Sequence, residues 1–375
     1  MKNTFGNSVS VTIFGESHGR EIGVVLDGLA PGIKVSEEEI SGRLLLRRPA
    51  GSISTKRVEP DHFRIVSGVF NGYTTGTPVC ILIPNENTDA RDYRSSRPLA
   101  RPGHADYTAY CKYHGYEDYR GGGHFSGRIT AALVAAGSIA LSALEGKGIC
   151  IGTHIAGCAG IRDRSFSGLP EGLRTDIRAL SERTFAVLDP EAAAAMQEAI
   201  RQAAGSGDSV GGILETAVIG LPAGIGEPWF DSVEGVLSHA LFSIPAVKGV
   251  EFGAGFALSD MKGSEANDSF AVRDNKIITK TNHNGGINGG ISNGMPVIFR
   301  CAVKPTPSIY TEQDTADFFT LTEKKIRISG RHDPAIVHRA RIVVDCVTAL
   351  VLCDLLSQRF GTDYLAVTDK AKDLV

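Results

Sequence analysis

Segments with strand-like and helix-like patterns follow one another along this chain in no regular order. Apolar and polar residues alternate from Val9 to Ile13, as in a half-buried strand, and 22–26 is expected to pair with it across the turn at 15–19. A helix is expected next, because Ser36 and Glu39 have the spacing of a capping box. A doubly wound parallel sheet requires strands and helices to alternate regularly. The irregular order therefore predicts α+β layers rather than a Rossmann domain.

The rest of the chain continues this mixture. Further strands are predicted at 63–70, 79–83, 211–221 and 295–303, with a hairpin at 270–281. Further helices are predicted at 128–144, 189–205, 231–243 (beginning at Asp231) and 334–360. No low-complexity linker divides the chain, so a single domain over residues 1–375 is expected, with 145–210 as a peripheral insertion.

Composition argues against several classes of protein. The formal net charge of −3 gives no basic field for nucleic acid. The seven cysteines are odd in number and form no CxxC pair, which argues against a disulfide framework and a zinc site. No signal-like apolar segment opens the chain, and the most apolar run, 347–353, is too short to span a bilayer. We therefore expect a cytoplasmic protein with no metal and no membrane or nucleic-acid partner.

Positive charge is concentrated in two places. Five basic residues and no acid lie between Arg43 and Val58, and four arginines with one acid lie between Arg91 and Arg101. The second run falls within 86–127, a long stretch without periodicity, and such stretches are usually functional or disordered. A single run is as often a solvated face as a site. Two runs beside glycine, proline and histidine favour a site for a small polyanion, because guanidinium groups suit carboxylate and phosphate.

Two histidines are candidates for proton transfer. His18 stands beside glycine in the turn at 15–19, and His104 follows Arg101-Pro102-Gly103. Histidine titrates near neutrality and can donate or accept a proton. A single histidine is more often structural, but two of them beside glycine and near arginine clusters favour catalysis. His283 and His332 are weaker candidates, and the other histidines, His154 among them, are expected to be structural.

Glycine-rich segments indicate a cofactor that bears phosphate. Gly121-Gly122-Gly123 leads to Ser126, the expected N-cap of a helix, whose free amides attract anions. No Walker A motif is present, and no GxGxxG follows a strand. The segment 281–294 offers bare backbone to a planar ligand, and 304–308 forms a rigid turn with polar side chains. Asp333 precedes a helix and is either its cap or a catalytic group.

Together these segments resemble the chorismate synthase family. The motifs that carry the resemblance are, in order, GESHG at 15–19, RPGHAD at 101–106 and GRHDP at 330–334, with further matches at 27–28, 74–78, 208–212 and 243–249. The similarity extends from about Gly6 to about Leu355. It implies a layered β-α-β sandwich, with antiparallel sheets around a helical layer, and a homotetramer.

Members of this family convert 5-enolpyruvylshikimate 3-phosphate to chorismate and phosphate, the last shared step of the shikimate pathway to aromatic amino acids. This anti-1,4-elimination requires reduced FMN but has no net redox change. The resemblance implies that His18 protonates the leaving phosphate, that His104 protonates the reduced flavin, and that Asp333 acts at flavin N5. NADPH is a candidate reductant, and the sequence leaves open whether the chain reduces its own flavin.

The resemblance also implies two sets of binding residues. Contacts to substrate or NADP are carried over to Arg47, Arg48 and Arg128. Contacts to the flavin are carried over to His124, Phe125, Ser126, Pro245, Ala246, Gly289, Lys304, Pro305, Thr306, Pro307, Ser308 and Arg331.

The chain departs from the family pattern in two places. The family commonly has Arg-Ser-Ser-Ala-Arg-Glu-Thr after the triple glycine, where this chain has 124–130 (HFSGRIT) and keeps Ser126 and Arg128. Many members also carry an arginine where this chain has Ile53. Two other functions were weighed: a flavin reductase that transfers hydride to FMN, and a polyanion-binding protein without chemistry. The joint presence of His18, His104 and Asp333 argues against the second.

Overall fold

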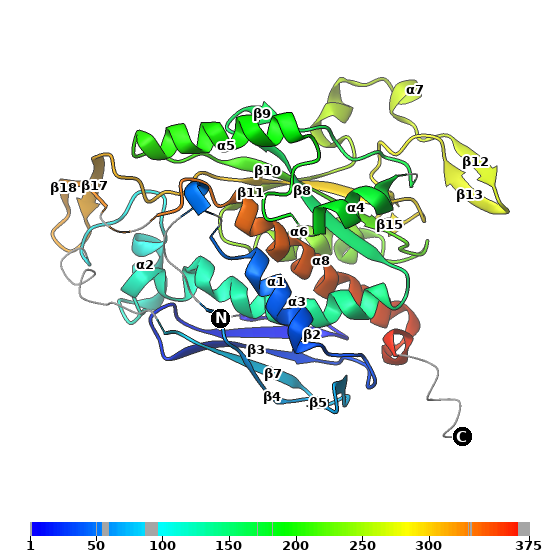
Figure 1. Cartoon of the computed structure of the whole chain (residues 1–375), viewed down its shortest axis with the longest axis horizontal. Helices are drawn as coiled ribbons and strands as arrows, with labels where there is room; N and C mark the ends of the chain where they lie inside the picture. The colour runs from blue at the N-terminus through cyan, green and yellow to red at the C-terminus, as the bar shows by residue number, and fades with distance from the viewer. Residues whose placement is uncertain are drawn as a thin grey trace.

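Two antiparallel five-stranded sheets enclose a layer of helices in the computed structural model (Figure 1). It describes residues 2–49, 51–54, 60–86, 97–170, 172–181, 183–328, 330 and 332–366. The first sheet has the order β1 (Thr4–Phe5), β2 (Ser10–Gly15), β3 (Glu21–Asp27), β7 (Val79–Pro84) and β4 (Arg64–Ser67). The second has the order β11 (Val247–Phe252), β16 (Val297–Val303), β10 (Gly212–Ile219), β8 (Cys150–Cys158) and β9 (Ile161–Arg162). The predicted α+β sandwich is confirmed.

The first sheet follows the sequence pattern closely, with one interruption. β2 and β3 pair across the predicted turn, with Val11 opposite Leu26. The strand expected at 63–70 is divided at Gly68 into β4 and β5 (Val69–Phe70), and β5 forms a hairpin with β6 (Tyr73–Thr74). Gly68 has a φ of +82°, and an added Cβ would lie 2.6 Å from the carbonyl oxygen of Pro78. Only glycine fits there, so the chain turns away from the sheet at this point.

Three helices form the middle layer: α1 (Glu37–Leu46), α3 (Thr130–Glu145) and α8 (Val337–Phe360). α3 packs on β3 and β7 and also against α8, which in turn covers β8 and β10. Gly137 allows the close approach of α8, since a Cβ there would lie 2.3 Å from the Cβ of Cys346. The apolar segment Gly127–Glu145 has the length and composition of a membrane span, but it is 89% buried inside the protein and is a core helix.

The second sheet contradicts the expectation that 145–210 is a peripheral insertion. β8 lies inside the sheet and pairs with β10 along its length. Only the later part, with α4 (Leu173–Ser181) and α5 (Pro190–Gly205), lies outside the sheet (Figure 1). Composition alone does not reveal that a strand pairs with another about 60 residues away, which is why the prediction was wrong.

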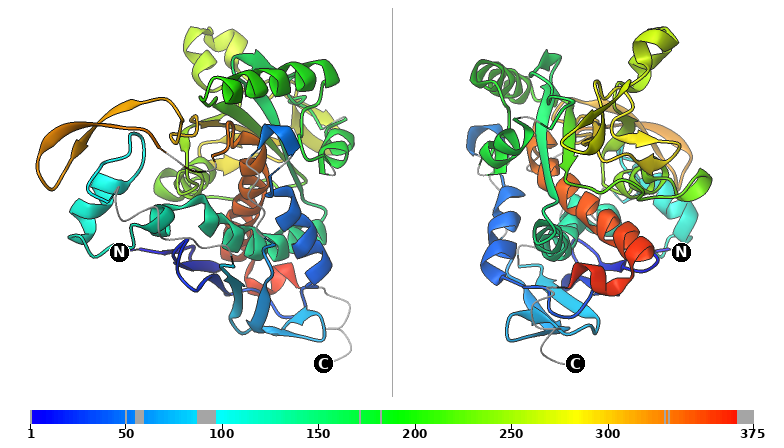
Figure 2. Two further views of the ribbon diagram at one scale, coloured as in Figure 1. Left: turned by 60° about the vertical axis from the view of Figure 1, so that its left-hand side comes forward. Right: turned by 90° about the vertical axis from the view of Figure 1, so that its right-hand side faces the viewer.

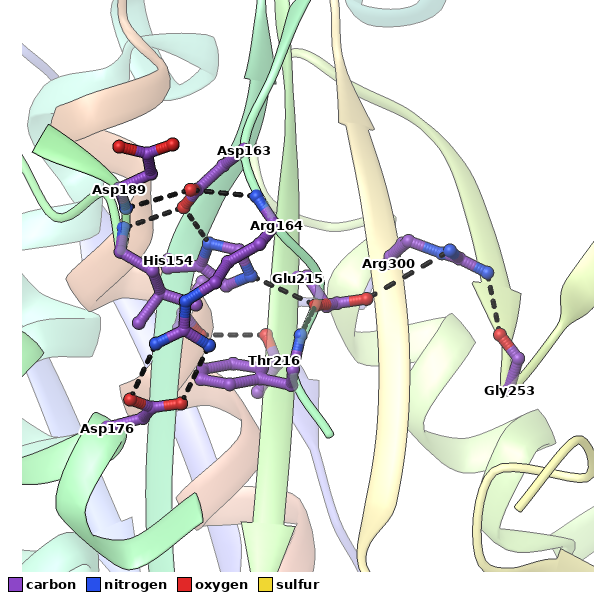
Figure 3. Close-up of polar contacts among 12 residues, drawn as sticks. His154, Asp163, Arg164, Asp176, Asp189, Glu215, Thr216, Gly253 and Arg300 are labelled. Atoms are coloured by element: carbon purple, nitrogen blue, oxygen red, sulfur yellow. Dashed lines mark hydrogen bonds and ion pairs between the residues drawn. The ribbon is translucent and has the colours of Figure 1, made fainter. Parts of the chain in front are cut away.

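Side chains of alternating charge cross the second sheet (Figure 3). His154 Nδ1 lies 2.8 Å from Asp163 Oδ2, and its Nε2 lies 2.9 Å from Glu215 Oε2. Glu215 stands opposite Arg300 in the register, and Arg300 forms an ion pair with Glu251 at 2.9 Å. Burial alone would lower the pKa of His154, but its hydrogen bonds to the two carboxylates raise it. Both ring nitrogens lie against carboxylates, which only accept, so His154 carries a proton on each and ties β8 to β10 and to Asp163 just after β9, in keeping with its expected structural role.

The segment 97–128 contains more helix than its sequence pattern indicated. It forms α2 (Asp106–Tyr113) and two 3-10 turns, η3 (Arg120–Phe125) and η4 (Gly127–Ile129). The hairpin of β17 (Gln313–Asp317) and β18 (Thr322–Ile326) reaches out over α2 (Figure 2), where the rings of Tyr110 and Phe318 lie 4.9 Å apart. This part of the chain borders the cavity described below.

Two smaller predictions have different outcomes. The hairpin of β12 (Phe270–Arg273) and β13 (Lys276–Thr279) is confirmed, with both turn residues in the left-handed region. α6 (Val233–Leu241) is capped by Ser232, whose Oγ accepts a hydrogen bond from the Gly235 amide, so the expected start at Asp231 is wrong. The remaining elements are η1 (Gly51–Ile53), η5 (Trp229–Asp231), η6 (Gly255–Asp260), α7 (Gly263–Ala266), β14 (Ile287–Asn288), β15 (Ile291–Ser292) and η7 (Thr362–Leu365).

Candidate active site

A cavity of about 1060 Å³ lies where the end of α1, the segment 97–128, the segment 242–247 and the start of α8 meet. Its volume is at the upper end of the range for small-molecule sites, which leaves room for more than one ligand. The cavity is lined by many of the residues that the sequence predicts for catalysis or binding: Arg47, Arg48, His104, His124, Phe125, Ser126, Arg128, Pro245, Ala246, Lys304, Pro307 and Asp333.

Five of the selected residues that the structure describes do not line the cavity. His18 lies directly behind its glycine wall, and Ser308 lies behind His104. Pro305 and Thr306 continue the turn that Lys304 and Pro307 present to the cavity. Gly289 is exposed in the turn between β14 and β15, so this structure does not bring it to the others. Arg331 lies outside the described residues.

The triple glycine forms the wall between the cavity and His18. Gly121, Gly122 and Gly123 have φ values of +61°, +102° and +54°, which residues with a side chain rarely adopt. A Cβ on Gly121 would lie 2.0 Å from Cε1 of His18, and one on Gly123 would lie 2.1 Å from the Asp118 carbonyl. The Ser17 amide donates to the Gly123 carbonyl at 3.1 Å, which ties the wall to the turn between β2 and β3. Bare backbone is therefore needed here for His18 to approach the cavity.

His104 is held at both ring nitrogens. Nδ1 lies 3.1 Å from the Pro102 carbonyl oxygen, and Nε2 lies 2.8 Å from Ser308 Oγ. A carbonyl only accepts, so Nδ1 carries a proton, and a neutral ring then accepts from the Ser308 hydroxyl at Nε2. Burial, followed by the positive charge of Arg101, lowers the pKa of His104 to about 4. Without an anionic ligand, His104 is neutral at pH 7.

One buried carboxylate is shared by two arginines of the cavity. Asp61 accepts hydrogen bonds from Arg47 Nη2 at 3.0 Å and from Arg128 Nη1. Arg128 also donates from Nε to Asn85 Oδ1 at 2.9 Å. Burial alone would raise the pKa of Asp61, but Arg47 and then Arg128 hold it below its ordinary value. The group thus contains two guanidinium ions and one carboxylate, with a net charge of about +1.

Asp333 is held by Arg339 of α8. Nη1 of Arg339 donates to the Asp333 carboxylate, and its Nε donates to the Arg47 carbonyl oxygen at 2.8 Å. Both side chains line the cavity. Arg339 therefore links the expected catalytic carboxylate to the backbone of the residue expected to bind substrate.

Other cations at the cavity differ in their partners. Arg101 forms two hydrogen bonds to the carboxylate of Asp106, at 2.8 and 2.7 Å. Arg48 and Lys304 instead donate to the backbone carbonyls of Pro60 and Gly103. Among the described residues, neither has a carboxylate partner, so these two charges are available to an anionic ligand.

Sequence reasoning missed the residues that hold the arginines, namely Asp61, Asn85 and Asp106, and it missed Arg339, which holds Asp333. A carboxylate is unexpected in an anion site when only its charge is considered. Two signals were nevertheless present: Asp106 ends the RPGHAD motif, and Arg339 lies six positions after Asp333 at the start of a predicted helix. The cavity as a whole can bind a polyanion, hold a neutral histidine beside it and present the Asp333 carboxylate.

Comparisons with known proteins identify the family of the chain. The family model described as chorismate synthase matches residues 9–357. A chorismate synthase of Pyrococcus abyssi is 48% identical over 351 residues, covering 94% of this chain and 96% of that relative. One of Thermococcus gammatolerans is 47% identical over 354 residues, covering 94% and 97%. A crystal structure of chorismate synthase aligns with a TM-score of 0.75 at 28% identity, covering 96% of this chain and 94% of that chain.

Proposed function

The chain belongs to the chorismate synthase family, and we propose that the cavity between α1, the segment 97–128 and α8 binds both the substrate and reduced FMN. The activity is that of the family: elimination of phosphate from 5-enolpyruvylshikimate 3-phosphate to give chorismate, a carbon–oxygen lyase reaction of aromatic amino acid biosynthesis. The observation that carries the proposal is the convergence of arginines, a neutral histidine, a carboxylate and bare glycine backbone on one space.

The substrate carries one phosphate and two carboxylates, and the cationic side chains of the cavity suit such a ligand. Arg47 Nε and Arg48 Nε are buried without hydrogen-bond partners among the described residues. A buried N–H of a charged group that lacks an acceptor is costly, and an anionic ligand satisfies it. We therefore assign substrate binding to Arg47, Arg48 and Arg128, with Lys304 as a further cation at the same cavity.

The lining also suits a flat, phosphate-bearing flavin. Gly127 lines the cavity, and an added Cβ there would have no atom within 4 Å, so bare backbone borders open space. We assign flavin contact to this wall, with Phe125, Ser126, Pro245, Ala246, Lys304 and Pro307 around it. His124 lines the same wall and donates from Nδ1 to the Gly15 carbonyl at 2.7 Å. Reduced FMN, when bound, supplies a transient electron that eases cleavage of the carbon–oxygen bond.

Three side chains of the chain manage protons in this proposal. His18, behind Gly121, donates a proton to the leaving phosphate. His104 is neutral in the free protein, and a nearby anion would raise its pKa, so that ligand binding charges it. Asp333 would act at N5 of the bound flavin to help remove the proton lost from the substrate ring, and Arg339 keeps its carboxylate directed at the cavity.

We further propose that residues 1–375 act as a single domain within a cytoplasmic homotetramer, with NADPH as the candidate reductant. Exposed apolar side chains support self-association: Trp229, Phe230 and Val272 are 86%, 94% and 77% exposed. Their exposure by itself does not identify the partner, so the assembly rests on the family resemblance.

An anaerobic assay with chemically reduced FMN and 5-enolpyruvylshikimate 3-phosphate tests the proposal. We expect phosphate and chorismate in equal amounts over many turnovers, with the flavin still reduced at the end. A flavin reductase would instead consume NADPH without releasing phosphate, and a binding protein would release none. A parallel assay with NADPH and oxidised FMN alone determines whether the chain reduces its own flavin.

A further inference from the structure

We propose that Asp61 is a positioning residue for anion recognition, which holds Arg47 and Arg128 side by side so that both address one anionic group of the substrate. The inference rests on the proposed substrate site. It adds a residue that neither the sequence motifs nor the family resemblance singled out, and it assigns a function to a carboxylate inside an anion-binding cavity.

The contacts of Asp61 divide evenly between the two arginines. Its Oδ2 accepts from Arg47 and its Oδ1 from Arg128. Arg47 caps the end of α1 and Arg128 lies in η4, two elements 81 positions apart in the chain, and Asp61 reaches both from a third segment. The carboxylate therefore fixes the separation of two guanidinium groups that no continuous backbone element fixes.

The backbone of Asp61 supports a positioning role. Its φ is +50°, in the left-handed region that residues other than glycine adopt uncommonly. Strained conformations of this kind persist where the surroundings enforce them, and they cluster at functional sites. Here the conformation coincides with two ion pairs at the wall of the cavity.

Charge and burial explain why the residue is an aspartate. The side chain of Asp61 is 1% exposed, and those of Arg47 and Arg128 are each 6% exposed. Two adjacent guanidinium ions so far from water repel each other strongly, and one carboxylate between them offsets this repulsion. The remaining net charge of about +1 favours an anion in the cavity that both arginines line.

Asn85 also contacts Arg128, so its substitution provides a matched control for that of Asp61. Its Oδ1 accepts from Arg128 Nε at 2.9 Å, while its Nδ2 donates to the carbonyls of Glu16 and Gly19 in the His18 turn. It holds Arg128 without any negative charge. Removal of Asn85 should loosen Arg128, but it leaves no space between two cations for a small anion to fill.

Chemical rescue of Asp61→Ala tests the proposal. The variant should bind 5-enolpyruvylshikimate 3-phosphate roughly 10- to 100-fold more weakly by calorimetry on flavin-free protein, because one charge-assisted contact to each arginine is lost. Sodium formate, which can occupy the vacated position of the carboxylate, should raise the melting temperature of Asp61→Ala and restore most of its substrate affinity. In the wild type and in Asn85→Ala, formate should only compete with the substrate and weaken its binding.

Each alternative result contradicts the proposal. A melting temperature raised by formate without restored substrate affinity would make the Asp61 pairs purely structural, and no effect of formate on either quantity would also overturn it. If Asp61→Ala does not fold, Asp61→Asn replaces it, with KM expected to rise about tenfold or more and kcat to change less. A fall in kcat at unchanged KM would refute positioning. Failure of the wild type to form chorismate would refute the proposed function instead, and the affinity measurements would still decide the role of Asp61.

Discussion

The imidazole of His104 and the hydroxyl of Ser308, 204 positions apart, meet at 2.8 Å, with Ser308 as the donor to Nε2. Burial, followed by the positive charge of Arg101, lowers the pKa of His104 to about 4, and a hydroxyl that donates to Nε2 suits the neutral ring. A histidine proposed to give up a proton is therefore uncharged in the resting protein. Its activation must come from the negative charge of the ligands.

The titration of His104 follows from this relationship. In the free protein we expect no change of charge at His104 between roughly pH 6 and pH 8, and binding of the anionic substrate should raise its pKa. Ser308→Ala should also raise the pKa, because the donor to the neutral ring is lost, whereas Ser308→Thr should not. NMR of the labelled His104 imidazole measures its pKa in the free protein, in the substrate complex and in the two Ser308 variants. A midpoint near 6.5 in the free wild type would contradict the account.

Two glycine substitutions should distinguish the role of Gly121, which contacts His18, from that of Gly127, which borders the open space of the cavity. Gly121→Ala places a methyl group 2.0 Å from Cε1 of His18 at a φ of +61°, so His18 must move, and turnover should fall about 100-fold or more. Gly127→Ala adds a methyl group that meets open space, so the melting temperature should not fall, while flavin affinity should weaken. Equal effects of the two substitutions on turnover and on flavin binding would contradict these assignments.

Arg339 should be needed for turnover more than for stability. Arg339→Met removes its contacts to Asp333 and to the Arg47 carbonyl, and we expect kcat/KM to fall roughly 10- to 100-fold. Arg339→Lys keeps the charge and should retain more activity. Steady-state kinetics with reduced FMN and melting curves check this. Wild-type kinetics in Arg339→Met would show that the ion pair does not position Asp333.

The row of alternating charges around His154 in the second sheet should affect stability without affecting catalysis. His154→Gln leaves Asp163 and Glu215 without the cation between them, at a cost of about 3–5 kcal/mol, while the substrate KM should stay unchanged. Because the folded pKa of His154 is raised above 6.5, its stabilisation is present below pH 6.5 and is lost as the pH rises through that folded value. Melting curves over pH should show this alkaline loss in the wild type only. The same loss in His154→Gln would assign it to another group.

Local patterns predicted the elements that local physics determines. α5 begins at Asp189 and Pro190, and α3 follows its apolar composition, because caps and periodicity are written within a few residues. α2 was missed because only Ala109 of its residues is buried and no side chain caps its start. β8 was not predicted, because the strand that it pairs with is distant in the sequence.

The site shows the same division between local and distant information. Arginines and histidines were recognisable from composition and motifs, whereas their partners were not. Asp61 acquires its role only when α1 and η4 meet, and Ser308 contacts His104 only through the packing of the 304–308 turn. Gly289 remains a prediction: its turn is exposed and does not line the cavity of this chain.

A crystal structure of the protein with oxidised FMN and 5-enolpyruvylshikimate 3-phosphate tests the central claim most directly. We expect both ligands in the cavity of about 1060 Å³, with the substrate anions on Arg47, Arg48 and Arg128 and the flavin against Gly127. Either ligand bound elsewhere, or a substrate that does not contact these arginines, would contradict the account.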